Sequence, residues 1–128
     1  MLEEKQGCNI MELLFQETKS FEKDLSKLPE KLKEKVINSI NEQSLSFVEN
    51  QVTNSQKIKR LAQSNHHLDS DSSLYELKVD LKTRVILSID DDPLFDQVIF
   101  TLYRIVSPKD FQAALKNISE SLYQRSKN

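Results

Sequence analysis

Apolar residues recur with two different periods along this chain. Between residues 21 and 40 they return at every third or fourth position, which predicts one face of an amphipathic α-helix. Pro29 interrupts this stripe, and proline is tolerated at the start of a helix but not in its interior. The pattern therefore predicts two helices packed as a hairpin, over about residues 19–27 and 29–47, with a Ser or Thr before Phe21 as the N-cap.

A second kind of pattern predicts β-strands. Three stretches rich in β-branched and aromatic residues follow one another, separated by turn-forming residues. They cover residues 74–79, 84–89 and 97–104. We expect residues 82–83 to join the first two as a tight hairpin and residues 90–93 to end the second. An earlier strand is predicted over residues 11–17.

The end of the chain predicts one more helix. Ser107 is a suitable N-cap and Pro108 suits the first helical position, while apolar residues recur from Phe111 to Leu122. The order of elements is then β-α-α-β-β-β-α. We expect an α+β fold in which a small antiparallel sheet packs against a helical hairpin, with a C-terminal helix. Residues 11–128 are expected to form a single domain, preceded by a disordered leader over residues 1–10.

Composition narrows the class of protein. The chain has 128 residues, of which 38% are hydrophobic and 30% charged, and one Gly. Its single cysteine, Cys8, excludes an internal disulfide, and no apolar run approaches the ~20 residues of a membrane span. We therefore expect a cytoplasmic protein without a membrane segment. The net charge of −2 and the pI of about 5.7 mean that any nucleic-acid-binding face is local.

Two acidic or histidine-containing stretches invite a metal interpretation. Residues 66–71 contain two adjacent histidines and two aspartates, and residues 90–92 are three consecutive aspartates. Neither has the spacing of a known metal motif, and adjacent side chains do not easily converge on one ion. Solvated loops explain both stretches, so we expect no metal and no cofactor.

Cationic residues on the predicted strands are the strongest candidates for function. Lys78, Arg84 and Arg104 come from three consecutive strands. A looser set of candidate RNA-binding cations surrounds them in the sequence: Lys57, Lys59, Arg60 and Lys82. The alternative is structural, because Lys78 and Arg84 are also suitable cross-strand partners for Glu76 and Asp80.

Several stretches together resemble the RelE/ParE toxin superfamily, the toxin half of type II toxin–antitoxin pairs. Residues 21–29 resemble the opening helix of that family, and residues 74–79 resemble its Leu-Tyr-Glu-Leu-Arg strand. Residues 84–87 resemble the following strand, and Tyr103-Arg104 matches a basic position after the last one. The resemblance covers about residues 11–123.

The resemblance implies two kinds of activity and one kind of partner. One branch resembles RelE, which cuts mRNA on the ribosome and uses cations to stabilise the phosphate. It implies catalytic roles for Lys78, Arg84 and Arg104. The other branch resembles ParE, which inhibits DNA gyrase and cuts nothing. Both imply a cognate antitoxin protein that wraps the helical hairpin or adds to the sheet.

Two positions depart from the ribonuclease branch. Glu76 stands where that branch often has a second lysine, and Phe111 stands near its catalytic tyrosine. Phenylalanine cannot transfer a proton, which leaves Tyr103 or Tyr123 as substitutes. Three functions remain open: an mRNA endoribonuclease, a gyrase-binding toxin, and a decayed member that only binds its antitoxin.

Overall fold

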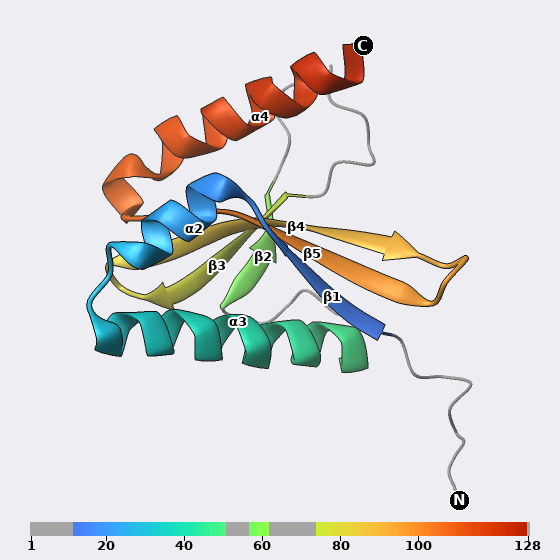
Figure 1. The fold of residues 1–128 in the computed structure, drawn as a ribbon, viewed down its shortest axis with the longest axis horizontal. Coiled ribbons are helices and arrows are strands. Elements are labelled where there is room, and N and C mark those ends of the chain that lie inside the picture. The colour runs from blue at the N-terminus through green and yellow to red at the C-terminus, as the bar shows by residue number, and fades with distance from the viewer. Residues whose placement is uncertain (1–11, 51–56, 62–73, 128) are drawn as a thin grey trace, which may run out of the picture.

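The computed structural model describes residues 12–50, 57–61 and 74–127 (Figure 1). Within them the chain forms one five-stranded sheet with helices on both faces. The elements in order are β1 Glu12–Glu17, α2 Lys19–Ser26, α3 Glu30–Asn50, β2 Ile58–Arg60, β3 Leu74–Asp80, β4 Thr83–Asp92, β5 Gln97–Val106, the 3₁₀ helix η1 Pro108–Asp110 and α4 Phe111–Lys127. The predicted α+β class is confirmed. The predicted leader lies outside the described residues.

The sheet differs from the prediction at both edges. Its strand order is β1-β5-β4-β3-β2, and β1 pairs with β5 in parallel, whereas the other neighbouring pairs are antiparallel. The predicted antiparallel pairing is confirmed for β3, β4 and β5, and the parallel pairing of β1 adds a feature that the sequence did not predict. The two helices that follow β1 carry the chain away before β2, so β1 is not part of a hairpin. The additional strand β2, which the sequence did not predict, is only three residues long.

Local signals explain where the helices begin. The hydroxyl of Thr18 accepts a hydrogen bond from the backbone N–H of Phe21 at 3.2 Å, which caps α2 as predicted. Pro29 directly precedes α3, where its missing N–H costs no helical hydrogen bond. Ser107 precedes η1 instead of α4, and its hydroxyl lies 3.2 Å from a carboxylate oxygen of Asp110. The predicted helix whose apolar residues recur from Phe111 is confirmed as α4.

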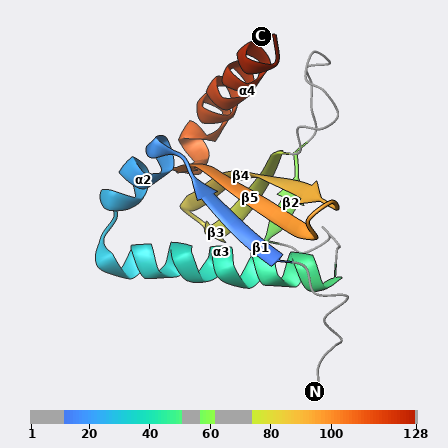
Figure 2. The same ribbon diagram turned by 45° about the vertical axis from the view of Figure 1, so that its right-hand side comes forward.

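Two hydrophobic cores lie on opposite faces of the sheet. Figure 2 shows α3 on one side and α4 on the other. The larger core joins α2 and α3 to the strands, and its buried members include Phe21, Val36, Ile40, Leu77, Val85, Leu87, Phe100 and Leu102. The smaller core joins α4 to the strands through Leu74, Ile86, Val106, Phe111, Ala114 and Ile118. Because α4 covers only part of its face, the rest of that face is available for polar residues.

The β4–β5 hairpin is longer than predicted. The three aspartates at residues 90–92 pair with β5 as part of β4, whereas the sequence predicted that they would end the strand. The turn instead covers residues 93–96, and Asp96 has a φ of 53°. Aspartate is one of the few non-glycine residues that tolerates this left-handed region. A hairpin register that pairs Asp92 with Gln97 is therefore compatible with the sequence.

Candidate functional site

The strand register brings the three predicted cations to one face of the sheet. Lys78 of β3 lies opposite Arg84 of β4, and Ile86 of β4 lies opposite Arg104 of β5. Alternate residues of a strand share a face, and so do directly opposed residues of neighbouring strands. Lys78, Arg84 and Arg104 therefore share the face on which Ile86 packs against α4. The register thus places on one face the three cations that the sequence assigned to consecutive strands.

A β-bulge in β5 makes this placement possible. Leu87 pairs with Leu102, but the next residue back, Ile86, pairs with Arg104, so Tyr103 is an extra residue in β5. Leu102 and Ile105 consequently both reach the core under α3. Tyr103 packs against the other core, under α4, and neighbours Arg104 along the chain. Nothing in the amino-acid pattern of β5 signalled the bulge.

Two of the four candidate RNA-binding cations extend the face across β2. Lys59 lies opposite Glu76, and its Nζ is 3.8 Å from a carboxylate oxygen of Glu76. The carbonyl of Lys57 accepts the backbone N–H of Lys78 at 2.7 Å, which places Lys57 beside the row of Lys78 and Arg84.

The other two candidates lie elsewhere. Arg60 lies opposite Tyr75, whose side chain belongs to the core under α3, so Arg60 is on the opposite face of the sheet from Lys59. Lys82 lies in the exposed turn between β3 and β4, at the margin of the cationic face. The structure therefore brings Lys57 and Lys59 to the three central cations, but not Arg60.

Glu76 lies between two of these cations. Its Oε2 accepts a hydrogen bond from Nε of Arg84 at 3.1 Å, while Oε1 faces Lys59. The side chains of Glu76 and Arg84 are only 17% and 14% exposed, so this pair is well shielded from water. Arg84 also donates through Nη1 to the carbonyls of Asp80 and Thr83. Arg84 is therefore a partner of Glu76, as the structural alternative predicted. Its hydrogen bonds use Nε and Nη1 of the guanidinium.

Arg104 has a carboxylate partner of its own. Its Nε donates to Oδ2 of Asp24 at 2.7 Å, and Nη2 lies 3.4 Å from Oδ1. The same Oδ2 accepts the backbone N–H of Ile105 at 2.9 Å. Asp24 therefore ties α2 to β5 while it balances the charge of Arg104. Sequence analysis missed Asp24, because it lies 80 residues away and looks like an ordinary polar residue of a helix.

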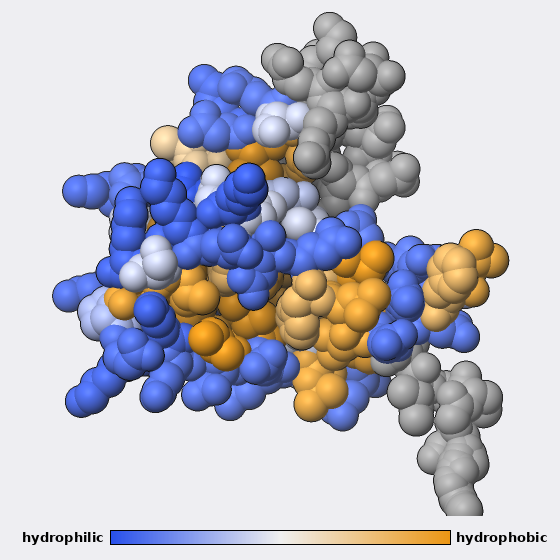
Figure 3. All heavy atoms as spheres, in the orientation of Figure 1, coloured by the Kyte–Doolittle hydropathy of each residue, from blue (hydrophilic) through white to orange (hydrophobic). Residues whose placement is uncertain are grey.

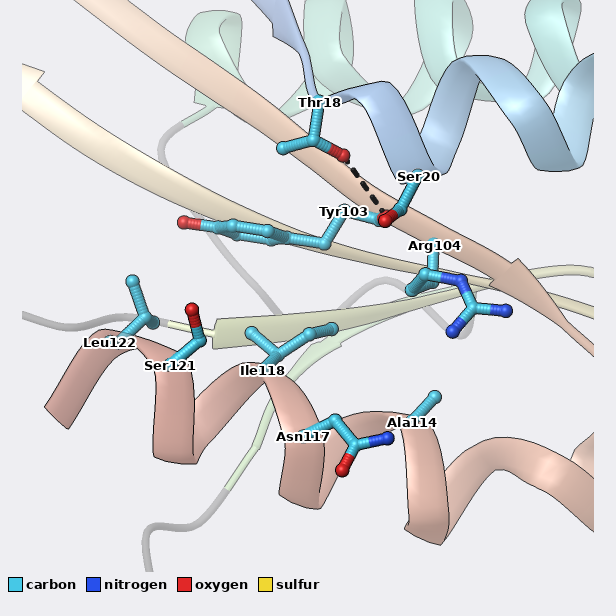
Figure 4. A pocket seen from close by; sticks show the side chains of 9 residues that line it. All are labelled: Thr18, Ser20, Tyr103, Arg104, Ala114, Asn117, Ile118, Ser121 and Leu122. Carbon is cyan, nitrogen blue, oxygen red and sulfur yellow. Dashed lines mark hydrogen bonds between the residues drawn. The ribbon is translucent and has the colours of Figure 1, made fainter. Parts of the chain in front are cut away.

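An open cleft of about 360 Å³ adjoins Arg104 (Figure 4). Its walls come from the start of α2, the bulged part of β5 and the inner side of α4, and they consist of Thr18, Ser20, Tyr103, Arg104, Ala114, Asn117, Ile118, Ser121 and Leu122. The hydroxyl of Thr18 is bonded to the carbonyls of Leu102 and Tyr103 at 3.0 and 3.2 Å, which holds α2 against β5. The cleft is a recess large enough for a small ligand beside one of the candidate cations.

The aromatic residues near the site differ in whether they can transfer a proton. Phe111 is 7% exposed and packs in the core under α4, where its ring contributes no proton donor. The hydroxyl of Tyr103 lies 3.5 Å from Oγ of Ser88 on the cationic side of the sheet. Among the described side chains, Tyr103 is the tyrosine on that side. The side chain of Tyr123, the other predicted substitute, lies outside the described part of the chain.

The turn that leads into Arg84 is fixed by Asp80. Burial acts to raise the pKa of Asp80, but hydrogen bonds from the backbone N–H of Lys82 and the Thr83 hydroxyl, together with Lys35, lower it below its usual value. Oδ2 of Asp80 is 3.3 Å from Nζ of Lys35, and Oδ1 is 2.9 Å from the N–H of Lys82. On the other face, burial raises the pKa of Tyr75, against a smaller opposing effect of Arg60.

The described residues contain neither a candidate metal cluster nor a helix that could span a membrane. Among the described residues, no three His, Cys, Asp or Glu side chains are grouped so that they could hold a metal ion. The histidines and aspartates of residues 66–71 fall outside that part of the chain. The described helices include none with the length and hydropathy needed to cross a membrane.

Comparisons with known proteins give matches among solved structures. No family model and no curated protein matches the sequence. One match is to a chain of the archaeal RelE–RelB complex from Pyrococcus horikoshii OT3, with 16% identity, a TM-score of 0.48 and coverage of 76% of this chain and 96% of that one.

Two further matches are of the same kind. The toxin–antitoxin complex RelBE2 from Mycobacterium tuberculosis matches with 16% identity and a TM-score of 0.43, over 73% of this chain and 95% of that one. The RelB–RelE antitoxin–toxin complex from Methanococcus jannaschii matches with 22% identity and a TM-score of 0.41, over 78% and 95%. At these identities and TM-scores the likeness concerns the arrangement of elements, and the function has to be argued from the residues of this chain.

Proposed function

We propose that this chain is the toxin of a type II toxin–antitoxin pair and acts as a RelE-like, ribosome-dependent mRNA endoribonuclease that inhibits translation in the cytoplasm. The observation that carries the proposal is the register that places Lys78, Arg84 and Arg104 on one face of the sheet. Lys59 of β2 and Lys57, directly before β2, extend this face. Such a row of cations suits the phosphate backbone of a nucleic acid.

The chemistry that this face supports is attack of a ribose 2′-OH on the adjacent phosphorus. The new P–O2′ bond forms as the P–O5′ bond breaks, which leaves a 2′,3′-cyclic phosphate and a free 5′-OH. Negative charge builds on the phosphate oxygens, and Lys78, Arg84 and Arg104 stabilise it. We assign to the hydroxyl of Tyr103 the donation of a proton to the leaving O5′, because this hydroxyl lies on the same side of the sheet, while the proton of the 2′-OH passes to solvent water.

A second candidate function is a toxin or former toxin that cuts nothing. It is favoured by the carboxylates that already occupy the two arginines, Glu76 on Arg84 and Asp24 on Arg104. It is also favoured by Phe111, which is buried where the ribonuclease branch has a tyrosine. A ParE-like protein that binds gyrase, or a member that binds only its antitoxin, needs no phosphate site.

Either candidate needs a surface for a cognate antitoxin. An apolar hollow of about 190 Å³ lies among β1, α2 and α3, and it includes Phe15 and Ile37, which are 39% and 43% exposed. Figure 3 shows apolar surface in the region of β1, the edge strand of the sheet. We propose that an antitoxin segment covers this hollow and pairs with the β1 edge, since exposed edges accept added strands.

Expression of the chain in bacterial cells tests the ribonuclease. We expect growth arrest with new mRNA 5′ ends at ribosome-bound codons, and loss of both with Lys78→Met or Arg84→Ala. Arg84 is an internal ion-pair partner, so the folded state of its variant has to be checked by thermal unfolding. Lys78 is exposed, and its variant is expected to fold normally.

Controls separate the alternatives. Lys31→Met, an exposed change on α3 away from the cationic face, should leave the cleavage pattern unchanged. Growth arrest with intact mRNA would reject the endoribonuclease, and altered plasmid supercoiling would then identify the gyrase alternative. A chain that causes no growth arrest but forms a complex with the neighbouring antitoxin would be a decayed member.

A further inference from the structure

The β4–β5 hairpin projects beyond the rest of the sheet and ends in an apolar tip (Figure 1). Leu94 and Phe95, in the turn between the two strands, are 82% and 66% exposed. Figure 3 shows apolar surface at this projecting end. The N–H of Phe95 donates to the carbonyl of Asp92 at 3.3 Å, and the N–H of Glu12 in β1 donates to the carbonyl of residue 96 at 2.9 Å. An ordered apolar tip of this kind is suited to binding a protein partner.

The charged residues of this hairpin are all acidic. Residues 90–96 include four aspartates, and no Lys or Arg occurs over residues 85–103. Side chains alternate along β4, so Asp90 and Asp92 lie on the same face of the sheet as Ile86. That is the face on which the cations lie, closer to the other end of the hairpin. One face of the molecule therefore carries negative charge at the tip and positive charge farther along the strands.

The cleft beside Arg104 has the complementary character. Tyr103, Ile118 and Leu122 give it apolar surface, and none of the nine residues described around it is acidic. Figure 4 shows Tyr103 and Arg104 on the β5 side, across the cleft from α4. Arg104 pairs with Asp24 through Nε and Nη2, so the two N–H groups on Nη1 lie outside this pairing. The cleft can therefore receive an aromatic ring and a carboxylate side by side.

We propose that the hairpin tip of one copy of this chain inserts into the cleft of a second copy. The ring of Phe95 then lies against Tyr103 of the other copy, and the aspartates of the hairpin approach Arg104 there. Tip and cleft match in hydrophobicity and in charge, which is the reason for assigning a second copy as the occupant. The cleft volume of about 360 Å³ accommodates one aromatic side chain. This inference goes beyond the proposed function, because it requires no RNA.

Two copies related by a two-fold axis use both features twice. Gln97 begins β5 next to the tip and Tyr103 lines the cleft, so tip and cleft are ~20 Å apart at about 3.3 Å per residue. In an antiparallel arrangement each copy gives its tip and receives that of the other, which closes the assembly at two copies. The dimer covers the cationic face, so self-association and binding of nucleic acid there exclude each other.

Sedimentation velocity of the purified full chain tests the proposal. We expect a dimer whose share rises with protein concentration and falls as salt is raised. Phe95→Ser removes the ring from the tip, and Ser121→Trp fills the cleft from an exposed position of α4. Each substitution should weaken dimerisation about tenfold or more, and thermal unfolding checks that each variant is folded. Leu45→Ser, at an apolar site 51% exposed on α3, across the sheet from the cleft, is the matched control and should leave the dimer unchanged.

A mixture of the two variants tests the pairing of tip with cleft directly. The Phe95→Ser copy keeps its cleft, and the Ser121→Trp copy keeps its tip. One of the two contacts can therefore form between the variants, whereas neither contact can form within a pure variant. We expect the mixture to associate more tightly than either variant does with itself.

Three results would overturn the proposal. A chain that is monomeric at all concentrations would leave the tip for a protein of another kind. A mixture that associates no better than its components would show that the tip does not enter the cleft, and equal effects of Leu45→Ser and Phe95→Ser would show that the copies meet elsewhere. A dimer of this kind in a chain that cuts no mRNA would support the tip contact and reject the endoribonuclease. A monomer that cuts mRNA would do the reverse.

Discussion

Glu76 accepts a hydrogen bond from Arg84 at 3.1 Å in the middle of a face that otherwise carries cations. The pair decides how much positive charge the face presents to a phosphate. Glu76 also faces Lys59 on the neighbouring strand, so one carboxylate compensates a candidate catalytic residue and a candidate RNA-binding residue. The net charge around Arg84 and Lys59 therefore depends on a single side chain, whereas the charge of Arg104 is balanced by Asp24.

Glu76→Gln is expected to strengthen RNA binding. The amide keeps the size of the side chain but removes one negative charge, and a unit charge at about 4 Å in water is worth about 1 kcal/mol, or roughly fivefold in affinity. Fluorescence anisotropy with a labelled single-stranded RNA measures this change, which should shrink as salt is raised. Glu30→Gln, at a site 84% exposed on α3, is the control. Equal effects of both substitutions would contradict the local role of Glu76.

Asp24→Asn is expected to lower the free energy of unfolding by about 2 kcal/mol, because hydrogen bonds to charged groups contribute roughly 1.5–3 kcal/mol. The variant keeps an acceptor for the N–H of Ile105 but leaves Arg104 without its counter-charge. Urea denaturation followed by circular dichroism measures the loss. Glu22→Gln, an exposed change on the same helix, should cost well under 1 kcal/mol. A loss no larger than that of the control would show that the ion pair adds little to stability.

Protonation of Asp80 is expected to lower the free energy of unfolding at acidic pH. Its pKa is lower in the folded chain than in the unfolded one, so the carboxylate contributes stability above the unfolded pKa of about 3.9. That contribution disappears as the pH falls through the lower folded pKa. Asp80→Asn should therefore reduce the difference between the free energies of unfolding at pH 7 and pH 3. Asp92→Asn, on the other hairpin, provides the comparison, and an identical reduction in both variants would count against Asp80.

Tyr103→Phe is expected to separate binding from chemistry. The ring and its packing under α4 remain, but the hydroxyl near Ser88 is lost. If that hydroxyl transfers a proton in the proposed cleavage, the rate should fall about 10²- to 10⁴-fold while RNA affinity stays within about twofold. Single-turnover cleavage on ribosomes measures the rate, and anisotropy measures the affinity. An unchanged rate would assign the proton to another group.

The sequence predicted what depends on local periodicity. The stripe from Phe21 to Ile40 gave the helical pair, and the β-branched runs gave the three long strands. It could not predict β2, because three residues carry too little periodicity and their partner strand β3 lies beyond a polar segment of the sequence. The parallel pairing of β1 with β5 depends on contacts across more than 80 residues, which neither strand encodes locally.

The sequence predicted the cations of the candidate site but not the carboxylates that neutralise their charge. Lys78, Arg84 and Arg104 were recognisable as cations on strands. Whether they carry free or neutralised charge depends on Glu76 and Asp24, and the Asp24 contact joins residues 80 positions apart. The cleft also escaped prediction, because its walls come from three elements that only the folded chain brings together.

The extra residue in β5 lets two neighbouring side chains, Tyr103 and Arg104, lie on the cationic side of the sheet. Because Leu102 lies opposite Leu87 and Arg104 lies opposite Ile86, a deletion of Tyr103 would close the ladder without turning the residues that follow. Arg104 would stay on the cationic face and Ile105 would stay in the core under α3, so only the tyrosine beside the arginine would be lost. If Tyr103 instead remained and the bulge closed, Tyr103 would lie opposite Ile86 and Arg104 would turn toward the hydrophobic core. A homologous chain that is one residue shorter here would therefore keep the arginine and lack the tyrosine.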